Sequence, residues 1–363
     1  MKSRDLPKTY IPDKEYSFKE FSNKHFGGGK ILGEEEFIEI TNSDIICSIF
    51  TNCTFGNVKF KDCSFIGCKF NECNFESGGV LFENCTFFKE ESEKKPSLNR
   101  FDNFSCEFYK CNIYSKFDGC ILSYLIFDEC LIHNTFFNLS DMSSVMIINS
   151  EFKRIRIEDC DLSGIKIIDT YIVDLDFTDK MKTKFDQKTF FDKIKLRKKN
   201  RDEYEGIYMT YETIADKFKE NSLNNNFGEY YYLAKKTERS VVSFTSKMTS
   251  YLYWETCGYG ERPINSIVFS LVVIIIFAFL YSIFGIKIDD TIVTVIKYRI
   301  YEYNEIFSCL KEEFLLSVNL FSGVGANESI PINLSEAIAS IEILFGVIMM
   351  GIGTGTVVRK LVR

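Results

Sequence analysis

The sequence contains little tryptophan, proline or histidine: one Trp, five Pro and two His occur in 363 residues. With only His25 and His133, and no evident pairing of a nucleophile with a base, we expect no enzymatic activity and no catalytic residues. The net charge of -7 argues against the clustered basic surface that nucleic acids require, so we expect no nucleic-acid partner. The N-terminus lacks the charged and apolar regions of a cleavable signal, and we expect it to stay in the cytosol.

Cysteine and phenylalanine are abundant by contrast, with 13 Cys and 36 Phe. In a reducing compartment the cysteines are expected to remain thiols rather than to form disulfides. Such heavy use of one large apolar residue type suggests a repetitive architecture.

Bulky residues recur at every fifth position from about residue 45. The first set is Ile45, Phe50, Phe55, Phe60, Phe65, Phe70 and Phe75. A small or medium residue precedes each later member by two positions: Ser48, Cys53, Val58, Cys63, Cys68 and Cys73. The rhythm slips at 76–79, breaks at the polar stretch 89–99, and returns from Phe108 to Phe177. Neither a helix nor an ordinary strand has this period. A four-sided coil has a period of five if each side is one five-residue unit with two inward-facing residues.

This pattern resembles the pentapeptide-repeat family, which implies a right-handed quadrilateral β-helix over residues 37–180, after an N-terminal segment, 1–36. Ten of the cysteines occupy the small inward position, where we interpret them as buried apolar residues. Metal binding is the alternative, but Cys63, Cys68 and Cys73 would lie on successive sides and not converge. The family includes acidic rods that imitate DNA; we interpret this solenoid instead as a scaffold or docking module.

Residues 181–256 change to a helical period and indicate two or three amphipathic helices that form a cytoplasmic linker. The turn at 221–228 separates two of them in a pattern that resembles a tetratricopeptide-type pair. A basic run is interpreted as a solvated face, with contact to anionic headgroups as the alternative. It comprises Lys193, Lys195, Arg197, Lys198, Lys199 and Arg201.

Two apolar runs, 264–286 and 334–358, have the length needed to cross a bilayer and lie within a transmembrane domain, 257–363. Basic residues precede the first run and follow the second. By the positive-inside bias, both termini are expected to be cytoplasmic, in a multi-pass protein of the cell membrane.

The stretch 310–331 between these runs begins as an apolar segment too short to span and continues into glycine-bearing sequence, which indicates a re-entrant pore loop. It resembles the two-transmembrane, tetrameric potassium-channel family. The resemblance assigns Ser317 to the pore helix, Glu328 to an acidic ring at the outer mouth and Pro331 to the proline after the filter. The implied ion filter is Ser322, Gly323, Val324, Gly325, Ala326 and Asn327. The resemblance places Gly346 within one residue of the family's hinge glycine, and we expect Gly346, Gly351 and Gly353 to form a gating hinge that provides flexibility or close packing.

Departures from the family pattern weaken the expected selectivity. Gly323 replaces a threonine of the innermost ion site, and Ala326 and Asn327 replace the Tyr-Gly of the outer sites. Because selectivity depends on several successive coordinating sites, we expect a weakly selective homotetrameric channel for K⁺ or Na⁺ without a cofactor. Gating would pass through the cytoplasmic repeats, with a ligand, a partner protein or membrane tension as open stimuli. The alternatives are a pore that does not conduct and a membrane-tethered interaction scaffold.

Overall fold

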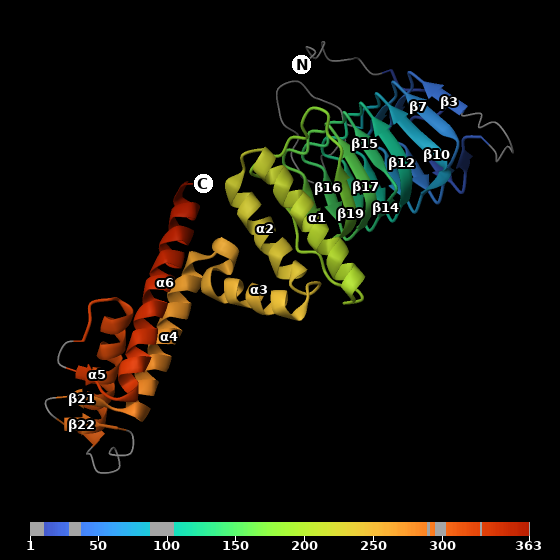
Figure 1. Ribbon diagram of the computed structural model, residues 1–363. Coiled ribbons are helices and arrows are strands. Elements are labelled where there is room, and N and C mark those ends of the chain that lie inside the picture. The colour runs from blue at the N-terminus through green and yellow to red at the C-terminus, as the bar shows by residue number, and fades with distance from the viewer. Residues whose placement is uncertain are drawn as a thin grey trace. The chain divides into compact units, whose positions relative to one another are not determined.

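The computed structural model describes residues 11–28, 38–87, 105–288, 291–294, 303–326 and 329–362. The chain divides into two compact units, Met1–Val241 and Val242–Arg363. Both units are shown in Figure 1.

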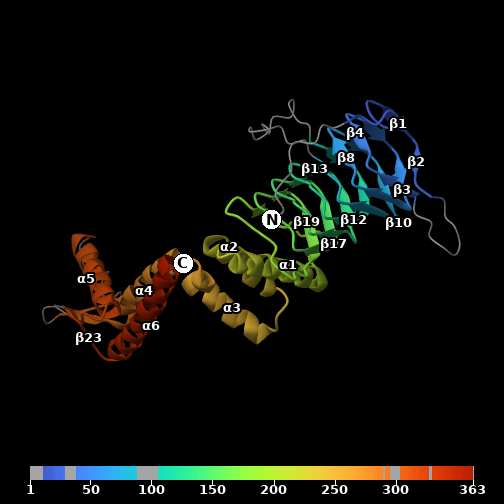
Figure 2. The ribbon, with the colours of Figure 1, turned by 90° about the horizontal axis from the view of Figure 1, so that it is seen from above.

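The first unit is a parallel β-solenoid of about 7 turns, followed by two helices. Three sets of ladder-forming strands run along it (Figures 1 and 2). One sheet holds β1 (Glu20–Ser22), β5 (Ile49–Thr51), β9 (Lys69–Asn71), β11 (Glu107–Tyr109), β13 (Ile126–Asp128), β16 (Met146–Ile148), β18 (Lys166–Ile168) and β20 (Phe190–Phe191). A second holds β2 (His25–Phe26), β3 (Ile38–Thr41), β6 (Thr54–Phe55), β7 (Val58–Lys61), β10 (Asn74–Glu83), β12 (Asn112–Asp118), β14 (Leu131–His133), β15 (Phe136–Asn138), β17 (Glu151–Glu158) and β19 (Tyr171–Phe177). A third comprises β4 (Asp44–Ile46) and β8 (Ser64–Ile66), and isolated bridges continue this line to Lys184.

The register of these ladders reflects the repeat. Ile147 lies opposite Phe127 on one side and Ile167 on the other, so 20 residues (147 − 127) separate equivalent positions. The slip expected at 76–79 is a register shift between Phe75 and Val80 within β10. The polar break at 89–99 falls outside the described residues. The parallel ladders extend from β1 to β20 and therefore beyond the expected range, 37–180, at both ends.

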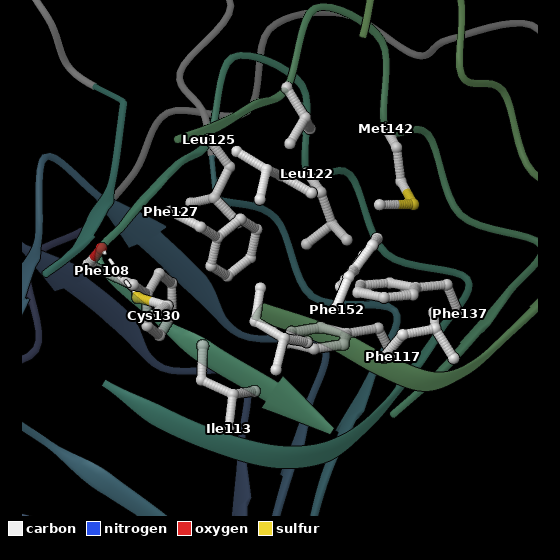
Figure 3. Close-up of a cluster of buried hydrophobic side chains, with 14 of the residues drawn as sticks. Phe108, Ile113, Phe117, Leu122, Leu125, Phe127, Cys130, Phe137, Met142 and Phe152 are labelled. Carbon is white, nitrogen blue, oxygen red and sulfur yellow. Dashed lines mark hydrogen bonds between the residues drawn. The ribbon is translucent and has the colours of Figure 1, made fainter. Parts of the chain in front are cut away.

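The solenoid core consists of stacked side chains from successive turns, part of which Figure 3 shows. The rings of Phe50 and Phe70 lie 4.9 Å apart and those of Phe70 and Phe108 4.5 Å apart, both stacked. Phe117 and Phe137 stack in the same way at 5.1 Å. Each aromatic pair contributes about 0.5–1.5 kcal/mol beyond the area that it buries. The repeated Phe is thus explained by stacking along the solenoid axis.

The ten cysteines at the small inward position are all buried. Nine of these thiols donate to backbone carbonyls of the preceding turn, as from Cys130 to Phe108 O at 3.2 Å (Figure 3), whereas Cys160 donates to Glu158 O. Later turns place hydroxyls there, for example Thr170, which donates to Ile147 O. Burial raises the pKa of Cys160 to about 12, so this thiol stays protonated at neutral pH. Within the described part of the chain, no group of three or more metal-ligating side chains converges.

Helices α1 (Arg201–Glu220) and α2 (Asn224–Glu238) pack against the last turn of the solenoid, with α1 alongside β19 (Figure 1). The Tyr230 hydroxyl accepts from the Phe191 N–H at 2.8 Å and donates to Phe191 O at 2.9 Å. The Tyr211 hydroxyl accepts from the Ile194 N–H at 2.7 Å. An open strand edge would otherwise expose these backbone groups for pairing with another chain. The helices therefore cap the solenoid as well as continue the chain.

Most of the basic run directly precedes α1, and Glu203 in the first turn of that helix binds its backbone. The Glu203 carboxylate accepts from the N–H groups of Arg197, Lys198 and Lys199 at 2.6–2.8 Å. Burial opposes ionisation, but these three donors outweigh it and lower the pKa of Glu203. Arg197 also pairs with Glu151 of the solenoid. The run therefore attaches α1 to the repeats while its side chains remain largely exposed.

The second unit contains α3 (Phe244–Cys257), the short helix η1 (Gly258–Gly260), α4 (Pro263–Phe284), α5 (Tyr303–Phe321) and α6 (Leu334–Val362). Pro263 starts α4, a position where its missing N–H costs nothing. A small antiparallel sheet joins β21 (Ile286–Ile288) to both β22 (Thr291–Val293) and β23 (Ser329–Pro331). Helices α4 and α6 lie side by side, with α5 packed against both (Figures 1 and 2).

Candidate functional site

Helices α4 and α6 are both long and apolar enough to cross a membrane. Only 33% and 22% of their most apolar windows are buried, so most of each window is exposed in the single chain. Large apolar side chains such as Ile264, Phe279 and Leu344 are about 60% exposed. An apolar surface of this extent requires lipid or another subunit to cover it.

Helix α5 covers part of both apolar helices and closes a small core. Its Leu316, Leu320 and Phe321 join a buried cluster with residues of α4 and α6. The cluster contains Val273, Ile274, Phe277, Tyr281, Ile286, Leu316, Leu320, Phe321, Ala339 and Met349. The helix is thus inserted against both candidate spans and does not extend away from them.

A polar network crosses this apolar core at Glu342 of α6. The Tyr281 hydroxyl donates to Glu342 Oε2 at 2.6 Å, and Ser317 of α5 hydrogen-bonds to the other carboxylate oxygen. Ser317 Oγ also contacts the carbonyl oxygen of Ile274 at 2.9 Å. All three polar side chains are fully buried. Ionisable residues inside apolar spans are rare and usually functional, so the network is a candidate site in its own right.

A second buried carboxylate, Glu313, accepts a hydrogen bond from Ser282 of α4. Glu313 lies one helical turn before Ser317 on α5, so the two polar contacts join α5 and α4 along one face. The resemblance assigned a place to Ser317 but none to Glu313, Tyr281 or Glu342. An acidic residue within an apolar run was the only signal for Glu342, and nothing in the sequence indicated its partners.

The segment expected to form the filter follows α5 directly. Gly323 has φ of 76° and Gly325 φ of 94°, a left-handed region that other residues adopt at a cost. The N–H groups of Val324 and Gly325 both donate to Asn319 O, at 2.9 and 3.3 Å. Ser322 donates its hydroxyl to the same carbonyl, and the Val324 side chain is 70% exposed. In this conformation the segment closes the C-terminal end of α5.

Ala326 is exposed and ends this part of the described chain. Asn327 and Glu328 lie outside the described residues, and the acidic ring expected from Glu328 therefore stays a prediction. Pro331 lies in β23 opposite Ile286, which connects the end of α4 to the start of α6. Ser335 strengthens this connection by donating to Gly285 O at 2.7 Å. This sheet was not anticipated from the sequence.

The three glycines expected to act as a hinge differ in their surroundings, although all lie within the unbroken helix α6. A Cβ at Gly346 would meet Phe321 O at 2.0 Å, so this glycine permits close approach of α5. A Cβ at Gly353 would make an ordinary contact with Ser266 at 3.8 Å, and one at Gly351 would meet nothing. Close packing thus accounts for Gly346 but not for Gly351.

The far end of α6 is joined to the turn between α3 and α4. Arg359 Nη2 lies 2.9 Å from Glu261 Oε1, and the Glu261 side chain is only 2% exposed. A Cβ at Gly260 would lie 2.9 Å from the Arg359 guanidinium, so the turn fits closely around it. The C-terminal end of α6 is therefore held against the turn that leads into α4.

Comparison with known protein families identifies the repeats. Residues 47–77 match the family model of pentapeptide repeats in eight copies. The chain carries a pentapeptide-repeat β-solenoid domain. The match lies within the first unit, and no curated protein matches the chain.

Several solved structures resemble the pentapeptide-repeat chain at low identity. Trypsin-treated QnrB1, a plasmid-mediated fluoroquinolone resistance protein, shares 14% identity over 45% of this chain and 76% of its own, with a TM-score of 0.21. The pentapeptide repeat protein Rfr23 from the cyanobacterium Cyanothece 51142 shares 9% over 49% and 88%, with a TM-score of 0.16. HetL from the cyanobacterium Nostoc sp. strain PCC 7120, involved in heterocyst differentiation regulation, shares 9% over 45% and 83%, with a TM-score of 0.14.

Proposed function

We propose that the chain forms a homotetrameric, weakly selective cation channel in the cell membrane, with the pentapeptide-repeat domain in the cytoplasm. The observation that carries this proposal is the packing of α5 against both α4 and α6, with a Gly-Val-Gly segment at its C-terminal end. A helix that precedes an irregular segment between two spans is the arrangement of a re-entrant pore loop. The carbonyl end of α5 would favour cations at that segment.

In the proposed tetramer, four copies of Ser322 to Asn327 line the pore and four copies of Glu328 form an acidic outer mouth. The Val324-Gly325 centre is the only part that retains the potassium-channel pattern, so K⁺ and Na⁺ should be poorly distinguished. The exposed apolar faces of α4 and α6 supply the surface that subunit contacts and lipid would cover. Permeant cations are the only ligands that the pore requires.

Both termini are proposed to be cytoplasmic, because basic residues such as Lys235 and Lys360 flank the outer ends of the helix pair. The solenoid is proposed to have a quadrilateral cross-section and to act as a docking module for an unidentified ligand or protein. Force from it would reach the pore through α3, since α3 leads directly into α4 and contacts α6. Gly346, Gly351 and Gly353 would then set how far α6 moves.

Single-channel recording in planar bilayers tests conduction directly. Purified protein is studied under K⁺, Na⁺ and Cl⁻ gradients, and we expect currents whose reversal potential follows the cations. Absence of currents under every condition, or reversal that follows Cl⁻, contradicts the proposal. Native mass spectrometry in mild detergent should give four subunits, and a stable monomer would contradict the central pore.

The Glu328→Gln variant tests the acidic mouth. We expect lower cation conductance at low salt, because the ring would no longer concentrate cations. At high salt the conductances of the variant and the wild type should converge, since screening removes the effect of the charge. Equal conductance at low salt counts against the ring, even if the channel conducts.

A membrane-tethered scaffold that does not conduct is the second candidate. It is favoured by the two N–H groups of Val324 and Gly325, which bond back to Asn319 O and hold the segment against α5. For a scaffold this capped end needs no rearrangement. The bilayer recordings and the subunit count distinguish the two functions, because only the channel requires currents and four copies.

A further inference from the structure

Glu342 of α6 contacts hydroxyl groups from two neighbouring helices. Tyr281 of α4 donates to its Oε2 at 2.6 Å, and Ser317 of α5 lies within hydrogen-bond distance of its Oε1. All three side chains are fully buried. The surrounding cluster of buried side chains is apolar, so a polar group that loses its partner here stays unsatisfied.

The number of hydrogen atoms in this network indicates which group donates in each contact. The Ser317 hydroxyl carries one hydrogen, yet its Oγ lies 2.9 Å from Ile274 O and also contacts Glu342. A carbonyl oxygen only accepts, so Ser317 satisfies Ile274 O with its own hydrogen. An ionised Glu342 would then present a second acceptor to a hydroxyl with no hydrogen left to give. The contact between Ser317 and Glu342 is a hydrogen bond if Glu342 supplies the hydrogen.

The surroundings of Glu342 also favour the neutral acid. An ionised carboxylate buried away from water needs a cation or several donors. Within the described residues, the hydrogen-bonding partners of Glu342 are two hydroxyl groups, and no ion pair reaches it. Glu313, one turn before Ser317 on α5, is a second buried acidic group on the same side of that helix and would repel an ionised Glu342.

Helices α5 and α6 meet again one turn further along. Gly346 follows Glu342 by four residues in α6, and Phe321 follows Ser317 by four residues in α5. A Cβ at Gly346 would lie 2.0 Å from Phe321 O, so the two backbones touch there. The segment expected to form the filter begins at the next residue, Ser322. The contact between Ser317 and Glu342 therefore holds α5 just over one turn before this segment.

We propose that Glu342 is a positioning residue of the pore loop: as a neutral acid it donates to Ser317, accepts from Tyr281 and so holds α5 against α4 and α6. This inference rests on the proposed channel function only for the role of α5 as a pore helix, because the hydrogen bonds lie within one subunit. A glutamine amide has the same shape, with an oxygen that accepts and an N–H that donates. Glu342→Gln should therefore keep the network, whereas Glu342→Ala and Ser317→Ala break it.

Infrared spectroscopy tests the neutral acid. The full-length protein is reconstituted in phosphatidylcholine vesicles, and the wild type is compared with Glu342→Gln at neutral pH in H₂O and in D₂O. We expect Glu342→Gln to lose the carbonyl band of an unionised carboxyl group. The control Glu336→Gln, which changes an exposed residue of the same helix, should keep that band. If Glu342→Gln loses a carboxylate band instead, the proposal is overturned.

Hydrogen–deuterium exchange in the same vesicles tests whether the network positions α5. Peptides that cover residues 314–325 report on the second half of α5 and the segment after it. We expect Glu342→Ala and Ser317→Ala each to speed exchange by about fivefold or more, and Glu342→Gln to exchange like the wild type. Ser317→Ala changes one hydroxyl group and carries this test if Glu342→Ala does not fold.

A double variant shows whether the two residues act through one contact. Ser317→Ala combined with Glu342→Ala should exchange no faster than Glu342→Ala alone, because the second substitution removes a hydrogen bond that is already lost. Additive acceleration overturns the shared contact. Unchanged exchange in the alanine variants, or exchange in Glu342→Gln as fast as in Glu342→Ala, overturns the proposal as a whole.

Recording in planar bilayers separates this inference from the proposed channel function. If the wild type conducts, Glu342→Gln should conduct like it, and both alanine variants should conduct less. Conduction at the wild-type level in both alanine variants overturns the positioning role. If the wild type is silent, the channel proposal fails, while the infrared and exchange results still decide the role of Glu342.

Discussion

Gly346→Ala tests how α6 meets the C-terminal end of α5. The added Cβ would lie 2.0 Å from the carbonyl oxygen of Phe321, 2.8 Å from its carbonyl carbon and 3.1 Å from its Cα. All three are backbone atoms, so no side chain can rotate away to make room. The substitution must therefore move α6 away from α5 and open the packed core beside them.

Two effects of opposite sign determine how much Gly346→Ala changes the free energy of unfolding. Alanine is favoured over glycine in a helix interior by about 1 kcal/mol, whereas overpacking a close contact costs about 1–3 kcal/mol. Gly351 is the matched control in the same helix, because a Cβ there meets nothing within 4 Å. Gly351→Ala carries the favourable effect alone. The two variants should thus differ in free energy of unfolding by about 1–3 kcal/mol, with Gly346→Ala the less stable.

Unfolding in mixed micelles with increasing dodecyl sulfate, followed by far-UV circular dichroism, measures this difference. We expect a lower midpoint for Gly346→Ala and an unchanged or higher midpoint for Gly351→Ala. Equal midpoints would refute the close-packing argument. If Gly346 acted only as a hinge, Gly346→Ala would change channel opening in bilayers and leave the unfolding midpoint unaltered.

Three further substitutions address other parts of the chain. Phe108→Ala removes a fully buried ring from the solenoid stack and should lower the urea stability of the solenoid by about 3–5 kcal/mol; a loss below 1 kcal/mol contradicts the tight stack. Arg359→Ala leaves the buried Glu261 carboxylate without this ion pair, so the dodecyl sulfate midpoint should fall, and Arg359→Lys should restore part of it. Glu342→Ala removes a carboxyl group that hydrogen-bonds to Ser317 and should lower the free energy of unfolding by about 1–3 kcal/mol in the same assay, more than Glu342→Gln does. Equal losses in the two variants would argue against hydrogen bonding as the cause.

The solenoid was largely predictable because its contacts repeat along the sequence. A five-residue period specifies which side chains face inward, and the buried set from Phe50 to Phe152 follows it. The first turn was missed although Phe21 and Phe26 have the same spacing, since two units alone do not establish a period. At the other end, the ladder continues to Phe191 after residues that no longer keep the rhythm.

The capping role of α1 and α2 was not predictable, because it depends on single contacts between distant residues. Tyr230 is 39 residues from Phe191, and nothing in the helical pattern identifies which backbone group its hydroxyl meets. The helical period did predict that these residues form helices. It could not indicate that one face covers the last strand of a solenoid.

In the second unit, Val242–Arg363, the helices were again predictable and the single contacts between distant residues were not. Length and apolar character identified both candidate spans, and the observed helices begin and end within a few residues of the expected limits. The network around Glu342 joins residues up to 61 positions apart, and the strand at 329–331 pairs with one more than 40 residues earlier. Such pairings arise from the packing of the helices and leave no periodic signal.

The capped state of Ser322 to Gly325 bears on how a pore of this sequence would form. Two N–H groups, those of Val324 and Gly325, bond to Asn319 O in the single chain. An extended filter would have to release them, at about 0.5–1.5 kcal/mol for each hydrogen bond. Tetramer contacts could offset a cost of that size, because each subunit leaves much of α4 and α6 uncovered. In the proposed tetramer, assembly and filter opening would then be one coupled step, so a variant that fails to assemble should keep the segment closed on α5.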